Sequence, residues 1–113
     1  MDLGLRDKVA IVTGGSRGIG RAIALGLADE GCRVAICARG EERLREAARE
    51  VEAKGVRALP VVADITKAED MERLVQAAAD AFDRIDILVN NASAYVAEDN
   101  DAAWQSTVVL QEM

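Results

Sequence analysis

The sequence has no histidine, and it has only one proline and three aromatic residues in 113. Without histidine the chain lacks the ligands of Cys/His zinc sites and the base of Ser-His or Cys-His nucleophile pairs. We therefore exclude a zinc site and disfavour hydrolase chemistry. Two cysteines, Cys32 and Cys37, are too few for an extracellular disulfide framework, and we expect both to be small buried residues.

Long apolar runs and an excess of positive charge are also missing. No apolar run approaches the about 18 residues of a membrane span, and no basic segment leads into one as in a secretory signal. The 14 basic and 20 acidic residues give a formal net charge of −6, which disfavours a nucleic-acid partner, because such partners need clustered Lys and Arg. These absences predict a cytoplasmic protein without a membrane or nucleic-acid partner.

The composition that remains is that of a folded domain. Half of the residues are hydrophobic and 30% are charged, and a chain of this length can build one domain with a modest core. We see no linker, repeat or low-complexity tract. The sequence predicts a single domain over residues 1–113.

Four short apolar runs alternate with stretches of helical periodicity. Apolar runs without polar alternation are typical of parallel strands that are buried on both faces. The pattern predicts an α/β fold with about four parallel strands and flanking helices. The expected strands are Val9–Val12, Val34–Cys37, Leu59–Val62 and Ile87–Val89.

Two of the intervening helices should each bury one face, because their apolar residues recur with a spacing of three and four. These residues are Leu44, Ala47, Ala48 and Val51 in one helix, and Met71, Leu74, Val75, Ala78 and Phe82 in the other.

Short polar and glycine signals predict where these elements end. Gly31 and Gly55 stand where the first two helices should stop, and Thr66 with Glu69 forms a capping box for the third. Pro60 falls at an expected strand start, where its missing N–H is tolerable. A further helix should begin at Asn100 or Asp101 and place Trp104, Val108 and Gln111 on one face.

The most informative segment is the glycine-rich turn between the first expected strand and the first helix. Glycines allow positive φ angles and a close approach of the backbone to a ligand, and a helix N-terminus favours anions. A strand, a glycine-rich turn and a helix together predict a phosphate cradle of a dinucleotide site; the alternative is a tight turn without a ligand. The candidate residues are Gly14, Gly15, Ser16, Arg17, Gly18, Ile19 and Gly20.

The spacing Thr-Gly-x-x-x-Gly-x-Gly resembles the coenzyme-binding turn of the short-chain dehydrogenases/reductases. The segment Asn90-Asn91-Ala92-Ser93 resembles the Asn-Asn-Ala-Gly motif of the same family, with Ser in place of Gly. The resemblance implies a Rossmann-type sheet that is incomplete relative to the family, whose members run to roughly twice this length. It also implies a homo-oligomeric parent enzyme and a truncated, N-terminal, dinucleotide-binding part.

The resemblance further implies residues for the cofactor. Arg17 and Arg39 resemble the basic pair that engages a 2′-phosphate, and Ala38 stands where NAD-specific members carry an acid, so NADP is expected and NAD is less so. The alternative for Arg39 is a solvated cation near Glu41 and Glu42.

The two remaining ends of strands supply the other candidate residues. Asp64 resembles the aspartate that accepts a hydrogen bond from the adenine amino group, with Ile65 packed on the ring. Asn91 and Ala92 would line the ribose side. The alternative for Asp64 is that it only helps to cap the following helix.

The catalytic residues of the family have no match. The family's proton donor is the Tyr of Tyr-x-x-x-Lys, but the only tyrosine is Tyr95, and four residues later stands Asp99, which would disfavour a phenolate. The family's active-site Asn would fall near Gln111. We expect the NADP-binding part of a short-chain reductase that transfers hydride between NADP(H) and a carbonyl or alcohol. The alternative is a stand-alone nucleotide-binding or interaction module without redox activity.

A half-sheet should also be fragile. The strand at Ile87–Val89 would lie at an open edge and promote aggregation, and Trp104 would be accessible to solvent.

Overall fold

A computed structural model describes residues 4–15, 18–91 and 107–110. Strands and helices alternate along most of the chain, as the sequence predicts. The strands are β1 (Val9–Thr13), β2 (Arg33–Ala38), β3 (Ala58–Val62), β4 (Ile87–Asn90) and β5 (Thr107–Leu110), and the helices are α1 (Gly18–Asp29), α2 (Glu41–Glu52) and α3 (Ala68–Phe82).

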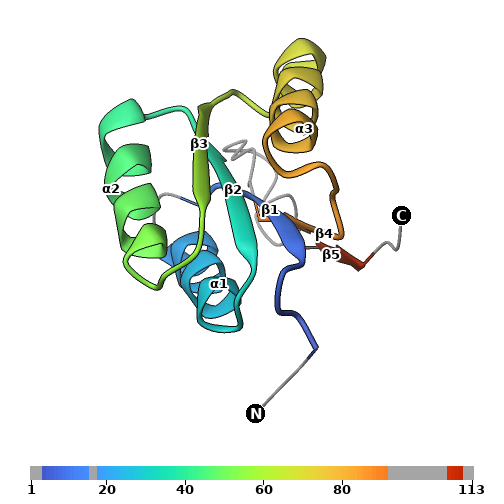
Figure 1. The fold of residues 1–113 in the computed structure, drawn as a ribbon. Coiled ribbons are helices and arrows are strands. Elements are labelled where there is room, and N and C mark those ends of the chain that lie inside the picture. The colour runs from blue at the N-terminus through green and yellow to red at the C-terminus, as the bar shows by residue number, and fades with distance from the viewer. Residues whose placement is uncertain (1–3, 16–17, 92–106, 111–113) are drawn as a thin grey trace.

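The strands form one five-stranded sheet in the order β3-β2-β1-β4-β5 (Figure 1). Strands β1 to β4 are mutually parallel, whereas β5 runs antiparallel to β4. The chain moves outward from β1 to β3 on one side, then crosses to the other side of β1 and forms β4. The sheet therefore has its topological switch point between β1 and β4, where open α/β sheets bind ligands.

The four predicted strands are confirmed, each within one residue of its expected ends. Pro60 was expected at a strand start, but it is the third residue of β3 and lies opposite Ile36. It is tolerated because β3 is an edge strand, whose outer side needs no donor.

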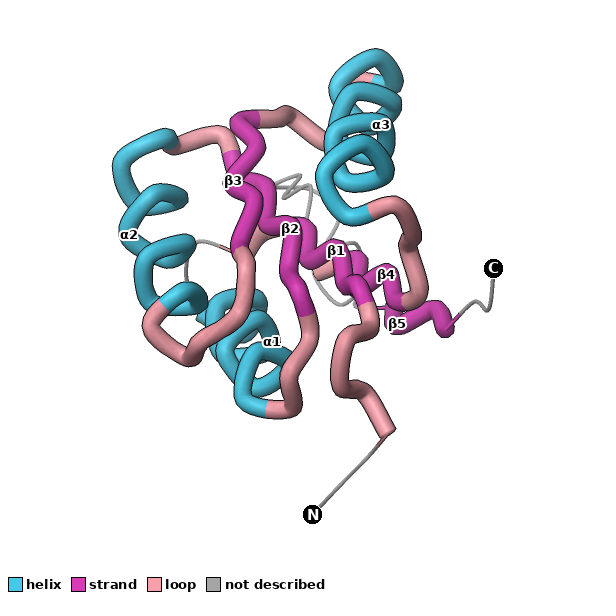
Figure 2. The backbone as a smooth tube through the Cα atoms, in the orientation of Figure 1, coloured by secondary structure: helices cyan, strands magenta, loops and turns pink. Residues whose placement is uncertain are grey.

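The helices cover the two faces of the sheet unequally (Figure 2). Helices α1 and α2 pack on one face and α3 packs on the other, and each face has its own apolar cluster. The predicted face of α2 is entirely buried, and on α3 the buried residues are Leu74, Ala78 and Phe82. Val75 is 43% exposed and lies outside this stripe, so its expected burial was wrong.

Two of the three predicted helix boundaries are confirmed. Gly31 and Gly55 follow α1 and α2 with φ of +90° and +92°, which only glycine adopts without strain. The capping box at Thr66 and Glu69 was wrong. Helix α3 begins after Lys67, no side chain caps it, and the Thr66 hydroxyl donates to the Asp64 carboxylate instead, at 2.6 Å. A nearby acceptor therefore competed successfully with the helix end.

The expectations for the C-terminal segment were wrong where the structure describes it. Residues 107–110 form strand β5 rather than part of a helix. They pair with all four residues of β4, from Asn90 opposite Thr107 to Ile87 opposite Leu110, so β4 is not an open edge. Pairing satisfies backbone groups that an edge would expose, and this outweighs a short helical pattern. Trp104 lies outside the described residues.

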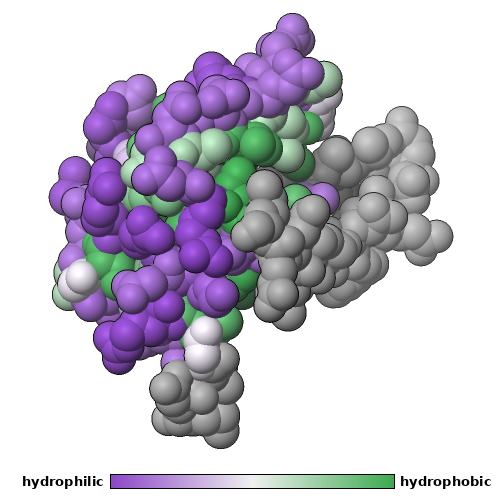
Figure 3. Space-filling model, turned by 45° about the vertical axis from the view of Figure 1, so that its right-hand side comes forward, coloured by the Kyte–Doolittle hydropathy of each residue, from purple (hydrophilic) through white to green (hydrophobic). Residues whose placement is uncertain are grey.

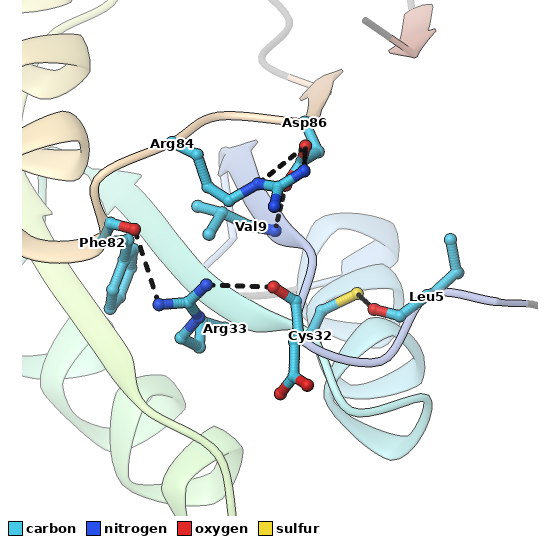
Figure 4. Close-up of polar contacts among 8 residues, drawn as sticks. Leu5, Val9, Cys32, Arg33, Phe82, Arg84 and Asp86 are labelled. Carbon is cyan, nitrogen blue, oxygen red and sulfur yellow. Dashed lines mark hydrogen bonds and ion pairs between the residues drawn. The ribbon is translucent and has the colours of Figure 1, made fainter. Parts of the chain in front are cut away.

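At the amino ends of the strands, Asp86 joins β1 to β4 (Figure 4). Its Oδ2 accepts the N–H of Val9 at 2.9 Å, its own N–H donates to the Val9 carbonyl at 2.9 Å, and Arg84 donates to Oδ1. Burial raises the pKa of this carboxyl, but the hydrogen bonds from Arg84 and Val9 outweigh it and hold the pKa below its ordinary value. Asp86 therefore extends the β1–β4 pairing with a side chain.

Arg33 ties the end of α3 to the same edge of the sheet. Its guanidinium donates to the carbonyls of Phe82 and Asp7 and lies 5.7 Å from the centre of the Phe82 ring (Figure 4). Arg57 lies 5.2 Å from the same ring and donates to the Ala81 carbonyl. Both cations meet the C-terminus of α3, where the helix dipole favours positive charge.

We predict that Asp86→Ala lowers the free energy of unfolding by about 1–3 kcal/mol at pH 7, because the buried Val9 N–H loses its acceptor. Urea denaturation measures this change. The matched control is Asp80→Ala, which removes an exposed carboxylate that accepts only from Gln76 four residues earlier in the described chain.

The same comparison has a defined pH dependence. Because the folded pKa of Asp86 is lowered, its contribution is present above the ordinary Asp pKa of about 3.9 and disappears as the pH falls through the folded pKa. The stability difference between the unaltered chain and Asp86→Ala should therefore shrink in acid. A difference that stays constant down to pH 2 would contradict this account.

Candidate functional site

The carboxyl ends of the four parallel strands lie together at one end of the sheet. Because the strands are parallel and in register, Thr13 at the end of β1 lies between Cys37 of β2 and Asn90 of β4. The glycine-rich turn leaves the sheet from this point. All candidate residues that the structure describes lie on the turn or follow one of these strands.

The glycine-rich turn uses two positive φ angles. Gly14 has φ of +68° and Gly18 has φ of +62°, so a side chain at either position would be strained. The N–H groups of Gly14 and Gly15 both donate to the Cys37 carbonyl, at 2.9 and 3.2 Å. These two donors anchor the turn to β2. Since these two N–H groups are used, an anion at this turn would face the N-terminus of α1.

Two other positions in the turn are glycine because no space exists for a side chain. A Cβ on Gly15 would lie 2.9 Å from Cγ2 of Ile36. A Cβ on Gly20 would lie 2.2 Å from the Gly14 carbonyl oxygen and 2.7 Å from Nδ2 of Asn91. Helix α1 therefore approaches both the turn and Asn91 as closely as the backbone permits.

The Thr13 hydroxyl joins the ends of β1 and β4. It accepts the backbone N–H of Asn91 at 2.9 Å, and its own hydrogen faces the Val89 carbonyl at 3.3 Å and Oδ1 of Asn90 at 3.1 Å. Thr13 is 1% exposed. Because its hydroxyl is buried and bonded on both sides, Thr13 sets where the chain leaves β4 and thus where Asn91 stands.

Arg39 and Asp64 come together at the ends of β2 and β3. The N–H of Ala63 donates to the Ala38 carbonyl at 3.0 Å, which continues the pairing of these strands to their last residues. Arg39 is exposed directly after this bond. Hydrogen bonds from the Thr66 side chain and backbone hold the pKa of Asp64 below its ordinary value, and Arg39 and Lys67 add to this effect.

The other candidate residues differ in exposure. Ile19, in the first turn of α1, is 67% exposed, which is unusual for a side chain of this kind. Ile65 is half-buried against the apolar cluster under α3. Ser16, Arg17 and Ala92 lie outside the described residues, as do Ser93 and Tyr95.

The two cysteines are confirmed as buried, unpaired residues. Burial raises the pKa of Cys37, and burial with the nearby Asp86 and Glu30 raises the pKa of Cys32 to about 11. Thiols with raised pKa values are poor nucleophiles at neutral pH, so neither cysteine is a candidate for catalysis.

This geometry fits a phosphate-bearing ligand. Among the described residues, none beyond the chain neighbours and the backbone of α1 has an atom within 4 Å of the position that a Cβ on Gly18 would take. The dipole of α1 favours a negative charge at this end of the helix.

Comparison with known proteins decides the family. The family model described as short chain dehydrogenase matches residues 8–111, which is most of the chain. The chain belongs to the short-chain dehydrogenase family. Its parallel sheet with flanking helices is the Rossmann-like fold of that family, and the family binds a nicotinamide dinucleotide.

Curated relatives agree with this assignment. A 3-oxoacyl-(acyl-carrier-protein) reductase of Staphylococcus epidermidis is 41% identical over 95 residues, which are 83% of this chain and 38% of the relative. A short chain dehydrogenase/reductase of Aspergillus oryzae is 39% identical over 110 residues, which are 92% of this chain and 42% of the relative. The chain thus spans less than half the length of these relatives.

Solved structures of the family include complexes with either nicotinamide dinucleotide. A metagenomic short-chain oxidoreductase in complex with NADP is 41% identical, with a TM-score of 0.75 over 80% of this chain and 41% of that one. An NAD⁺-bound xylitol dehydrogenase is 37% identical, with a TM-score of 0.76 over 80% of this chain and 35% of that one.

The surface adds little to this picture. On the face drawn in Figure 3, hydrophilic residues cover much of the described surface, with hydrophobic residues between them. Among the described helices none is long and apolar enough to cross a membrane.

We predict that Gly20→Ala lowers the free energy of unfolding by about 1–3 kcal/mol, because the added Cβ forces α1 away from the Gly14 carbonyl and Asn91. Gly26→Ala is the matched control in the same helix. Among the described residues, none beyond the chain neighbours and the backbone of α1 has an atom within 4 Å of its Cβ position, so this substitution should stabilise the chain by about 0.5–1 kcal/mol. Equal effects of the two substitutions on the thermal midpoint would contradict the close approach.

Proposed function

We propose that this chain is the NADP-binding part of a short-chain dehydrogenase/reductase that transfers hydride between NADP(H) and a carbonyl or alcohol. One observation carries the proposal: the glycine-rich turn, the first turn of α1 and Asn91 meet at the switch point with no space for a side chain between them. Such an arrangement brings several backbone donors close to one phosphate-bearing ligand.

In this proposal each strand end binds a different part of the dinucleotide. The first turn of α1 binds the pyrophosphate, and Arg17 with Arg39 binds the 2′-phosphate. Asp64 and Ile65 form the adenine pocket, and Asn91 and Ala92 line the ribose on the nicotinamide side. The cofactor, when bound, supplies the hydride.

The preference for NADP over NAD rests on the end of β2. Ala38 presents no acid to a ribose diol, and Arg39 is exposed beside it. A planar guanidinium suits a phosphate better than a diol. The charge of Arg39 also contributes, after the Thr66 hydrogen bonds, to the lowered pKa of Asp64, so a cation lies near the proposed adenosine end.

Within this proposal the described residues bind and orient the cofactor, and proton transfer falls to other groups. The only tyrosine of the chain, Tyr95, is followed four residues later by Asp99 rather than Lys. We propose that this chain lacks the catalytic Ser and the Tyr-x-x-x-Lys of the family.

We predict that the chain binds NADPH more tightly than NADH and that Arg39→Ala weakens NADPH binding by about 1–3 kcal/mol, the range of a charge-assisted hydrogen bond. NADH binding should change little, because it has no 2′-phosphate. Isothermal titration calorimetry measures both affinities.

The matched control is Arg49→Ala, which removes an exposed cation from the last turn of α2, at the opposite end of that helix from Arg39. It should leave both affinities unchanged. Equal or tighter binding of NADH by the unaltered chain would contradict the proposed preference.

A further inference from the structure

The loop between β3 and α3 is held by side chains of α3 that the cofactor proposal does not use. Oδ2 of Asp70 accepts the backbone N–H of Asp64 at 2.7 Å, which is a charge-assisted hydrogen bond. Arg73 donates to the Val62 carbonyl at 2.6 Å and forms an ion pair with Asp70 at 3.5 Å. One turn of α3 thus binds the backbone on both sides of Ala63.

The Asp64 carboxylate is oriented from its other side by Thr66. Both the N–H and the hydroxyl of Thr66 donate to Oδ1 of Asp64, at 3.0 and 2.6 Å. Within the described part of the chain no hydrogen bond ends on Oδ2. The backbone of Asp64 is thus bonded to Asp70, and one oxygen of its carboxylate is bonded to Thr66.

We propose that Asp70 is a positioning residue that fixes Asp64 toward the adenine ring of the bound dinucleotide. The inference rests on the proposed function, in which Asp64 accepts from the adenine amino group. Asp70 does not touch the cofactor. It acts on the Asp64 backbone, and Arg73 acts with it through the Val62 carbonyl.

Charges around the two aspartates are compatible with this role. Bringing two carboxylates to one loop is unfavourable unless donors or cations offset it. The Asp64 N–H lowers the pKa of Asp70, with Arg73 and Lys67 adding to this effect. The Thr66 hydrogen bonds lower the pKa of Asp64, with smaller effects of Arg39 and Lys67. Both side chains therefore remain ionised at neutral pH. Asp70 is partly exposed, with 26% of its side chain accessible, so its removal leaves the core intact.

The test combines two measurements on Asp70→Ala, Asp70→Asn and the control Asp80→Ala. The first is amide hydrogen exchange of Asp64 by NMR without any nucleotide. The second is the ratio of affinities for NADPH and for its hypoxanthine analogue, in which a carbonyl oxygen replaces the amino group that Asp64 would contact.

We expect the Asp64 amide to exchange faster in Asp70→Ala, and the preference for NADPH over the analogue to fall by about fivefold, as expected for one lost hydrogen bond. Asp70→Asn should keep most of the slow exchange of the Asp64 amide and most of the preference for NADPH, because its amide oxygen can still accept the Asp64 N–H. Asp80→Ala should change neither.

The outcomes separate this inference from the proposed function. If Asp70→Ala keeps the full preference for NADPH, Asp70 does not position Asp64 and the inference is wrong, while the proposed function stands. If the unaltered chain binds both nucleotides equally, the inference is also wrong. Failure of the unaltered chain to bind NADPH at all would contradict both.

Discussion

The contact among the Gly14 carbonyl, Gly20 and the Asn91 amide is the constraint on which the rest of the structure depends. A single Cβ at Gly20 would lie 2.2 Å from the first and 2.7 Å from the last of these atoms. Helix α1 can approach the turn this closely only because the turn has glycine where side chains would otherwise stand. The approach places the positive end of α1 at the switch point, and the proposed pyrophosphate contact follows from that position.

The two ends of the sheet divide stability and function between them. At the amino ends of the strands, Asp86 joins β1 to β4 and Arg33 joins α3 to β2, so side chains add to the backbone pairing. At the carboxyl ends, the Thr13 hydroxyl joins the same two strands but leaves the Asn91 side chain beside the turn. The first end therefore locks the sheet, and the second presents groups to a ligand.

Much of this architecture could be predicted from local pattern. Leu44 and Val51 repeat with helical spacing and are buried, and Gly31 and Gly55 end helices where glycine is required. Contacts between segments far apart in the sequence could not be predicted, because they have no local sequence pattern. The hydrogen bond that the Asn91 N–H donates to the Thr13 hydroxyl spans 78 positions.

The two wrong secondary-structure predictions, the Thr66 cap and the C-terminal helix, failed because other interactions competed with the predicted ones. Thr66 has the sequence of a helix cap but donates to Asp64, because an acceptor two residues away is as accessible as the helix end. Residues 107–110 follow a helical pattern in the sequence, but pairing with β4 determines their structure. Of the candidate site, the glycine turn could be predicted, whereas the contacts of Gly15, Cys37 and Asp70 needed the structure.

The central claim is that a nicotinamide dinucleotide binds at the carboxyl edge of this sheet. Mapping backbone amide shifts by NMR during titration with NADPH tests it most directly. The account predicts saturable shifts at Gly18, Gly20, Arg39, Asp64 and Asn91, with Arg33 and Asp86 at the opposite edge unchanged. Shifts centred on Arg33 and Asp86, or no saturable shift at any residue, would contradict it.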